Sequence, residues 1–543
     1  MTEIKPLKSL NIIAANRQHH ATTTVLKNGK VLFSIEEERL NRFKYEGTPF
    51  LGILKTPEYI DSVDMIGLSG YLPLNKVEYN TLGFTHNLYS LLVSRTFLKN
   101  KDFAFFDFHN EHHLTHAAGA FFNSGFDKAL SIVLDGAGSR IGERRHLEET
   151  YSSFLFEYPC KYEVIEKTFF NNELKQSKDN LKSLGRFYSV LTLHFGFNSE
   201  YDCGKVMGIS SYGKKILDID WLNFFDKTGM NVNKNHELYE KTKKLKDFQL
   251  CADLAYTLQD YVQTKCLNII KELIKKTNCK NICLSGGYIL NCVSNYFVRK
   301  NLPEDVKIYV EPISHDGGTS IGAAKLIHHL QTGDTSKNPQ TTTYYGCTYN
   351  KNDVKQKIIN ENTKTVTKKD VASLLADNKI VAIYQGRSEQ GPRALGNRSI
   401  LFNPKNSKGK NIVNTVKKRE SFRPFAGTVL YEKSKEYFDM SVLDESPFMC
   451  YAVDVNKNKV KEIPAIVHVD NTCRIQTLKR DFNIHFYDLI KEFDKLTNTP
   501  ILLNTSFNLA GEPMVETIED ALKTLHNSDI DYLYLPELNT LIQ

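Results

Sequence analysis

The feature that most constrains this chain is a repeated order of apolar strand, glycine- or aspartate-bearing loop and helix. The apolar run 129–134 ends at Asp135-Gly136, the strand NICL runs into the loop SGGYILN, and the strand 308–310 runs into EPISHDGGTSIGAA. This order is typical of α/β folds, in which ligands gather at the carboxyl ends of strands. We therefore predict an α/β protein whose sites lie at strand ends.

The first segment predicts a β-hairpin followed by a change of character. Apolar strands at 10–15 and 23–26 precede Asn28-Gly29, a tight-turn dipeptide, and a third strand at 31–35. The run EEERLNRFK at 36–44 then replaces strand alternation by charge. It indicates either a solvated helix start or the edge of a site.

The length predicts more than one domain. A chain of 543 residues exceeds what one hydrophobic core normally serves, and its 41% hydrophobic and 24% charged content is that of globular proteins. The polar stretch QTGDTSKNPQTTT at 331–343 reads as a linker. We expect domains at 1–335 and 344–543, the second with its own strands in KIVAIYQG, PILLNTSF and DYLYL, and no internal repeat is visible.

Composition excludes several classes of protein. The N-terminal apolar stretch is too short for a signal peptide and no later run reaches membrane-spanning length, so we expect a cytoplasmic protein without membrane contact. Ten cysteines without a CxxC pair predict ordinary thiols, Cys279 and Cys283 included. The net charge of +7 is spread over scattered lysines, which favours a solvated surface over a nucleic-acid stripe; anionic small substrates would explain it equally well.

Two histidines and two aspartates predict a metal site. His112 and His116 are four residues apart on an expected helix, so both imidazoles project from one face. Asp135 ends a buried strand and Asp316 lies in the loop HDGGTS, where both carboxylates can reach one site. An HxxxH pair alone is usually without a metal, and the prediction depends on the carboxylates. The set is compatible with iron, manganese or zinc.

Glycine loops and clustered arginines predict anion binding. Ser285-Gly286-Gly287 exposes backbone amides where a helix begins, although a tight turn would explain it alone. The segments GRSEQGPRALGNRS, KKRESFRPF and NTSFNLAGEP concentrate basic groups beside prolines and glycines. Arginine forks bind phosphate and carboxylate in bidentate fashion, so these segments predict a pocket for a nucleotide triphosphate or an acyl phosphate.

The ensemble of motifs resembles the NodU/CmcH/TobZ family of carbamoyltransferases over essentially the whole chain. The motifs are HHLTHAAGAF with LDGAG, GKVMGISSYG, LSGGYILN, GRSEQGPRALGNRSIL, KKRESFRPFAG, HVDNTCRIQT and LLNTSFNLAGEP. The resemblance implies an N-terminal actin-like/sugar-kinase (ASKHA) domain, related to the threonylcarbamoyl transferase of tRNA modification, and a C-terminal YrdC-like α/β domain. It implies that the second domain converts carbamoyl phosphate and ATP to carbamoyladenylate, and that the first, with a metal that is usually iron, passes the carbamoyl group to an acceptor hydroxyl. Magnesium would accompany the ATP.

The resemblance also implies site residues. The metal ligands would be His112, His116, Asp135 and Asp316, and Gly286, Gly287 and Asn291 would face the adenylate. The pocket for carbamoyl phosphate and ATP would comprise Lys417, Arg423, Arg474, Asn504 and Ser506, with Arg393 and Arg398 as neighbours. Catalysis would depend on His112, His116, Lys417 and Arg423. The chemistry agrees, because a carbamoyl carbon is deactivated by its nitrogen and needs a better leaving group and a Lewis acid.

The chain departs from the family pattern near its N-terminus. His19-His20-Ala21-Thr22 stands where the family has His-Asp-Ala-Ser, and Lys44-Tyr45 where it has Lys-His. These changes indicate an unusual acceptor, and neither His19 nor His20 is assigned a catalytic role.

The acceptor itself stays open at this stage. A sugar-like or natural-product hydroxyl is favoured over the hydroxymethyl group of a modified pyrimidine in a nucleotide or nucleic acid. A sugar-kinase-like phosphotransferase would leave the arginine-rich half without a role, and a non-catalytic scaffold would not need the complete ligand set. A homodimer is expected only because two-fold dimers are the commonest oligomers.

Overall fold

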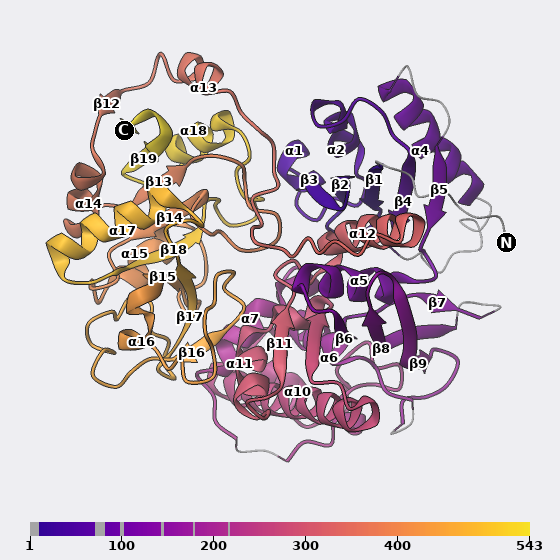
Figure 1. The fold of residues 1–543 in the computed structure, drawn as a ribbon. Coiled ribbons are helices and arrows are strands. Elements are labelled where there is room, and N and C mark those ends of the chain that lie inside the picture. The colour runs from indigo at the N-terminus through magenta and orange to yellow at the C-terminus, as the bar shows by residue number, and fades with distance from the viewer. Residues whose placement is uncertain (1–9, 71–81, 98–102, 143–145, 178–179, 216–217) are drawn as a thin grey trace. The chain divides into compact units, whose positions relative to one another are not determined.

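The computed structural model of the chain describes residues 10–70, 82–97, 103–142, 146–177, 180–215 and 218–543. The chain forms two compact units (Figure 1). Unit 1 comprises Met1–Asn41, Tyr45–Ser294 and Asn301–Thr341, and unit 2 comprises Arg42–Lys44, Asn295–Lys300 and Thr342–Gln543. Both are mixed α/β, which confirms the predicted fold class.

Unit 1 begins with a five-stranded sheet in the order β3-β2-β1-β4-β5. The first three strands are antiparallel, and β4 and β5 run parallel to β1. Asn28 and Gly29 have φ values of 51° and 75°, the left-handed pair that a tight hairpin requires, so the predicted hairpin is confirmed. The strands are β1 (Asn11–Asn16), β2 (Thr22–Lys27), β3 (Lys30–Glu36), β4 (Met65–Ser69) and β5 (Ala104–Asp107).

The second sheet of unit 1 repeats this topology. Strands β6, β8 and β9 form an antiparallel meander, and β10 and β11 lie on the other side of β6 and parallel to it. The two halves therefore share one strand order although the sequence shows no repeat, which is consistent with the actin-like domain that the resemblance implies. The strands are β6 (Lys128–Leu134), β7 (Arg140–Ile141), β8 (Leu147–Glu157), β9 (Lys161–Asn171), β10 (Asn281–Ser285) and β11 (Lys307–Val310).

Two helices cross between the sheets. Helix α5 (His112–Ser124) follows the first sheet in sequence but packs on β6, β8 and β10, whereas α12 (Thr319–Thr332) follows the second sheet but packs on β1, β2 and β4 (Figure 1). The helices also pack on each other, closely enough that a Cβ on Gly322 would lie 1.8 Å from the carbonyl oxygen of Thr115. Their apolar faces share one core with residues of both sheets.

The other helices of unit 1 lie around this framework. Among the described helices, α10 is the longest. The side chain of Asp247 caps its N-terminus by accepting the backbone N–H of Leu250. The helices are α1 (Glu37–Asn41), α2 (Phe50–Leu54), α4 (Leu82–Thr96), α6 (Leu184–His194), α7 (Cys203–Ser210), α8 (Trp221–Phe224), α9 (Tyr239–Thr242), α10 (Phe248–Thr277) and α11 (Cys292–Lys300), the last divided between the units.

Unit 2 is built on a nine-stranded sheet in the order β12-β20-β19-β13-β14-β18-β15-β17-β16. Helices α14 and α17 pack together and share a core with β13, β14, β18 and β19. The strands are β12 (Thr363–Thr365), β13 (Val381–Tyr384), β14 (Arg398–Phe402), β15 (Ala426–Leu430), β16 (Ala452–Asp454), β17 (Thr472–Leu478), β18 (Ile501–Ser506), β19 (Tyr532–Leu535) and β20 (Thr540–Ile542). The helices are α13 (Lys351–Lys357), α14 (Lys368–Ala376), α15 (Gly409–Val416), α16 (Ser434–Tyr437), α17 (Ile484–Thr497) and α18 (Ile518–His526).

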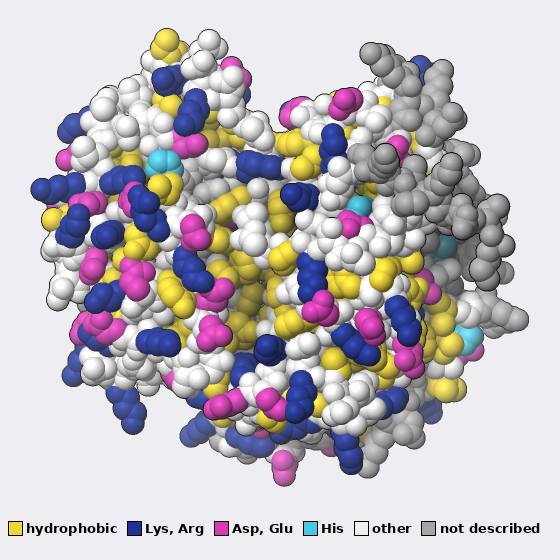
Figure 2. All heavy atoms as spheres, in the orientation of Figure 1, with side chains coloured by type: hydrophobic (Ala, Val, Ile, Leu, Met, Phe, Trp, Pro, Cys, Tyr) yellow, Lys and Arg dark blue, Asp and Glu magenta, His cyan; other side chains and the backbone are white. Residues whose placement is uncertain are grey.

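Several predictions about surface and burial can be compared with the structure. The solvated interpretation of the charged run at 36–44 is wrong at its start, because Glu36, Glu37, Glu38 and Arg39 are all buried. All ten cysteines are free thiols. On the face drawn in Figure 2, basic side chains are scattered among acidic ones and form no stripe. Within the described ranges, no helix combines the length and apolarity needed to cross a bilayer.

Candidate metal centre and anion-binding residues

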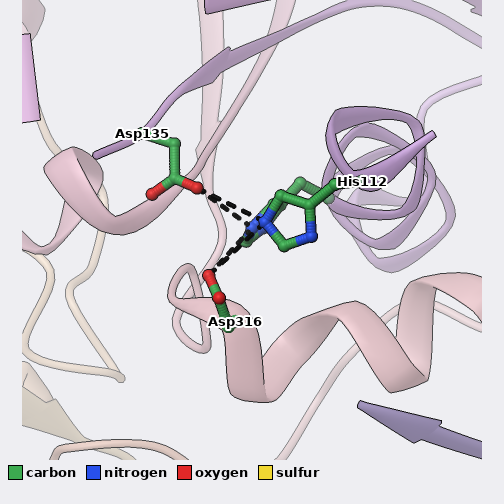
Figure 3. Close-up of side chains that lie close together, drawn as sticks. His112, Asp135 and Asp316 are labelled. Carbon is green, nitrogen blue, oxygen red and sulfur yellow. Dashed lines mark ion pairs between the residues drawn. The ribbon is translucent and has the colours of Figure 1, made fainter. Parts of the chain in front are cut away.

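The four predicted metal ligands converge in unit 1 and are all buried. Figure 3 shows His112, Asp135 and Asp316 pointing toward one another. Nε2 of His112 lies 3.4 Å from Oδ2 of Asp135 and 3.6 Å from Oδ1 of Asp316. Nε2 of His116 lies 3.7 Å and 3.5 Å from the same two oxygens. The residues come from α5, the end of β6 and the turn before α12, so three segments distant in sequence meet at one point.

Local hydrogen bonds position three of the four ligands. The backbone N–H of His112 donates to Oγ of Ser139 over 2.9 Å, which fixes the start of α5. Nδ1 of His116 lies 3.3 Å from Oγ of Ser285, so its Nε2 faces the cluster. Oδ1 of Asp135 accepts the N–H of Gly287 over 2.8 Å and leaves Oδ2 for the centre. Contacts of this kind set the tautomer and direction of metal ligands.

The electrostatics of the cluster favour a cation at its centre. Burial lowers the pKa of His112, but Asp316 and Asp135 outweigh burial and raise it to about 10. Burial raises the pKa of Asp135, yet His112 and His116 bring it down to about 2. The pKa of Asp316 is likewise held well below its usual range despite burial, through His19, His112 and His116. The protonated His112 ring thus supplies the positive charge between the two carboxylates, where a metal ion would otherwise supply it.

The geometry fits a single divalent ion. The four nitrogen-to-oxygen distances are 3.4–3.7 Å, and all four ligand atoms lie within 4.8 Å of one another, close enough to surround one ion. Nε2 of His116 has no hydrogen-bond partner in the described part of the chain, as expected of an atom reserved for a metal. Two imidazoles and two carboxylates suit iron, manganese or zinc, so the residues fit the metal that the resemblance implies.

A buried network that the sequence did not reveal supports the centre. Glu149 is buried, and its Oε2 accepts the N–H of Ser139, the residue that fixes the start of α5, over 3.2 Å. Its Oε1 accepts from Ser152 over 2.5 Å and lies 3.4 Å from His113. Burial lowers the pKa of His113 to about 4, so this ring is neutral at pH 7. The signal in the sequence was the adjacent acidic pair at 148–149 inside an otherwise half-apolar strand.

The glycine loop after β10 lies against the metal centre. Gly286 has φ 96°, and a Cβ there would lie 2.3 Å from the carbonyl oxygen of Leu134, so glycine is required by the close approach of β6. Gly287 contacts the ligand Asp135 directly. Asn291 donates to Gln259 over 2.9 Å, and its Oδ1 accepts the N–H of Ser294 over 3.0 Å. The structure thus places this predicted adenylate loop beside the predicted metal site.

In unit 2, five predicted pocket residues group around the ends of β15, β17 and β18. Lys417 is buried and its Nζ donates to the carbonyl oxygens of Ser506 and Asn508. Burial, together with Arg419 and Arg423, holds the pKa of Lys417 well below its usual range. The cations lie close enough to affect one another, and Arg419 belongs with them although the sequence did not single it out as a site residue.

The sheet brings the remaining pocket residues into register. In unit 2, Ala426 of β15 stands between Arg474 of β17 and Asn504 of β18. Nδ2 of Asn504 donates to the carbonyl oxygen of Ala394 over 3.2 Å and to Thr428 over 3.0 Å, so this amide is held rigidly. Arg423 is only half-buried and lies 3.7 Å from Glu420.

Arg398, a predicted neighbour of the pocket, has a structural role in unit 2. Its side chain is fully buried and stacks 3.8 Å from the centre of the Tyr384 ring. Its guanidinium donates to the carbonyl oxygens of Gln385, Gly386, Asn397 and Glu516. With its Nε and both terminal nitrogens donating to backbone oxygens, Arg398 holds the loop before β14, and its place as a neighbour of the pocket stays a prediction. Arg393 is half-buried in that loop and remains a predicted neighbour of the pocket.

Comparison with known proteins identifies the family to which the chain belongs. Residues 74–325 match the family model "Carbamoyltransferase N-terminus" and residues 372–541 match "Carbamoyltransferase C-terminus". Nodulation protein NolNO of Sinorhizobium fredii is 30% identical over 95% of this chain and 78% of its own length. The uncharacterized protein MJ1051 of Methanocaldococcus jannaschii is also 30% identical, over 95% of this chain and 97% of its own.

The chain therefore belongs to the carbamoyltransferase family and is a carbamoyltransferase enzyme. This confirms the resemblance found in the sequence. Among solved structures, HypF of T. kodakarensis aligns with 62% of this chain and 49% of its own at 16% identity, with a TM-score of 0.37, a level of likeness that supports no argument about function.

Proposed function

We propose that this enzyme is an ATP-dependent O-carbamoyltransferase that forms carbamoyladenylate in its C-terminal domain, predicted at 344–543, and transfers the carbamoyl group to an acceptor hydroxyl in its N-terminal domain, predicted at 1–335. The observation that carries the proposal is the buried set of two histidines and two aspartates in unit 1. A buried metal-binding set in one unit and a group of basic side chains in the other suit a reaction in two steps, activation followed by transfer.

The cation cluster of unit 2 suits the activation step. Carbamoyl phosphate and the ATP triphosphate are polyanions, and Lys417, Arg423 and Arg474 would neutralise them while magnesium accompanies the ATP. Asn504 and Ser506 would supply neutral hydrogen bonds. A fixed array of charges stabilises the developing negative charge without reorganising, because its orientation is already set by the fold.

The metal centre of unit 1 suits the transfer step. His112, His116, Asp135 and Asp316 would hold a divalent ion, iron by family resemblance, which supplies Lewis acidity toward the carbamoyl group or the attacking hydroxyl when bound. Gly286, Gly287 and Asn291 would hold the adenylate beside it. Water is kept out by burial, since His112 and His116 are almost fully enclosed.

The acceptor is proposed to be a hydroxyl-bearing small molecule. The sequence favours a sugar-like or natural-product alcohol, and the second candidate is the hydroxymethyl group of a modified pyrimidine. The metal centre itself serves either acceptor. A kinase of the same superfold would transfer phosphate and leave the cation cluster of unit 2 without a substrate.

The test separates the two half-reactions. Purified enzyme with ATP should release pyrophosphate only when carbamoyl phosphate is present; release without it, or phosphate transfer to a sugar, would contradict the proposal. Arg423→Ala should lower this release at least tenfold, whereas Arg480→Ala, an exposed arginine of the same unit, should not. His116→Ala should abolish transfer while pyrophosphate release persists, and His526→Ala, an exposed histidine, serves as its control.

A further inference from the structure

Four aromatic side chains form a cluster beside the metal centre. The ring cluster consists of His19, His20, Tyr45 and Tyr201, contributed by three separate segments of unit 1. His19 and Tyr201 are stacked at 4.4 Å and 15°, and Tyr45 lies 5.0 Å from Tyr201. His20 lies 5.3 Å from Tyr45 and 5.6 Å from Tyr201, both edge to face. Such distances are those of a packed aromatic group.

The ring cluster reaches the metal ligands through His19. Nε2 of His19 lies 3.4 Å from Oδ2 of Asp316. The ring of His20 stacks at 4.6 Å on His315, the neighbour of Asp316 in sequence. Unlike the buried ligands, Tyr201 is 39% exposed and the side chain of His19 is 23% exposed. The ring cluster is therefore an accessible edge of the buried centre.

The backbone holds the cluster in an uncommon conformation. His20 and Tyr45 have φ values of 61° and 62°, in the left-handed region that side chains other than glycine and asparagine rarely adopt. The buried amide of Asn16 donates to the carbonyl oxygens of His19 and His20, over 3.4 Å and 3.2 Å. Strain retained in this way is concentrated at binding and catalytic sites, where it fixes side chains in advance.

The chemistry of the ring cluster suits a flat heteroaromatic ligand. The carboxylates behind it already have partners: Glu38 accepts the N–H of Tyr45 over 2.8 Å, and Glu36 lies 3.5 Å from His315. A nucleobase binds proteins by stacking on aromatic faces. Tyrosine and imidazole rings supply those faces and hydrogen-bonding edges.

We propose that the ring cluster is the acceptor subsite and that the acceptor is a pyrimidine nucleotide carrying a hydroxymethyl group. This rests on the proposed function and selects between its two acceptors. The base stacks on the ring cluster and its CH2OH group points toward the metal centre. The hydroxymethyl oxygen then bonds to the carbamoyl carbon, the bond from that carbon to the phosphate oxygen of the adenylate breaks, AMP leaves, and the hydroxyl proton is lost to solvent.

The experiment uses the full-length metal-loaded enzyme with carbamoyl phosphate and ATP. It is offered 5-hydroxymethyl-deoxycytidine monophosphate, 5-hydroxymethyl-deoxyuridine monophosphate or an aminoglycoside, and mass spectrometry detects an added carbamoyl group. Product from either pyrimidine and none from the aminoglycoside supports the subsite. Product from the aminoglycoside alone, or pyrophosphate release without product from any of the three, overturns it and leaves the activation step standing. Absence of pyrophosphate release overturns the proposed function instead.

A binding measurement is independent of turnover. Calorimetric titration of the metal-loaded enzyme with 5-hydroxymethyl-deoxycytidine monophosphate should give a Kd that rises about tenfold in Tyr201→Ala and changes little in Tyr201→Phe, because stacking is lost only in the first. Tyr256→Ala, an equally exposed tyrosine on α10, is the matched control and should match the unaltered enzyme. Equal affinities in Tyr201→Ala and Tyr256→Ala, or no binding by the unaltered enzyme, would overturn the proposal.

Discussion

Metal binding to the centre of unit 1 should displace a proton from His112. The two aspartates raise the pKa of this imidazole to about 10, so at pH 7 it is protonated in the metal-free protein. A metal ligand must be neutral, and removing the proton three pH units below its pKa costs about 4 kcal/mol. The apparent affinity should therefore rise about tenfold per pH unit from pH 7 toward the pKa.

Isothermal titration of metal-free protein with Zn²⁺ measures this displacement. Titrations in buffers of different ionisation enthalpy should show about one proton released from His112 per ion at pH 7.5. In Asp316→Asn, the loss of the carboxylate that contributes most to raising the pKa should reduce both the proton release and the pH dependence, in addition to weakening binding. His526→Ala, exposed and far from the site in sequence, is the control. Binding that is independent of pH and releases no proton would refute the assignment of His112 as a buried imidazolium.

Four further outcomes test the structure. Gly286→Ala should destabilise unit 1 by about 3 kcal/mol or more in denaturant unfolding, because a Cβ meets backbone at 2.3 Å, and near-native stability would contradict the close approach. Arg398→Ala should cost about 3–5 kcal/mol by leaving buried carbonyls without donors, while Arg480→Ala should cost little; equal costs would contradict the structural role of Arg398. Glu149→Gln should weaken metal binding about tenfold while the fold stays intact by circular dichroism, and unchanged affinity would remove it as a positioning residue. Because the folded pKa of His112 is raised, its contribution to the stability of the metal-free protein is complete below pH 6.5 and should be lost as pH rises toward 10, so melting temperatures that do not fall across this window would contradict it.

The sequence predicted those parts of the site that follow from local rules. The four-residue spacing of His112 and His116 places them one turn apart on α5, and the apolar strand before Asp135 sets that carboxylate at a strand end. Asn28-Gly29 similarly determined a hairpin through its allowed backbone angles. In each case a few neighbouring residues determine the local structure, so it could be predicted without knowing the tertiary contacts.

What the sequence did not reveal depends on contacts between distant segments. Glu149 reaches the start of α5 only because β8 pairs with β6, and Arg398 became structural only because its loop folds around it. The sequence left the charged run at 36–44 as either a solvated helix start or the edge of a site. Burial of Glu37 could not be predicted, because the backbone N–H groups that stabilise it belong to Leu51 and Gly52. The strand order shared by the two sheets of unit 1 could not be seen in the sequence, because two segments can keep the same topology without keeping similar side chains.

The crossing of α5 and α12 would give a metal ion bound at the centre a mechanical part in the protein. His112 and His116 lie on the helix that packs on the second sheet, whereas Asp316 lies in the turn directly before the helix that packs on the first. An ion held by both therefore fastens one half of unit 1 to the other at their crossing point. Removing it should loosen the seam between the two halves, so that amide hydrogen exchange accelerates along α5 and α12 before either sheet is affected, and the supply of metal would govern the rigidity of the enzyme as well as its chemistry.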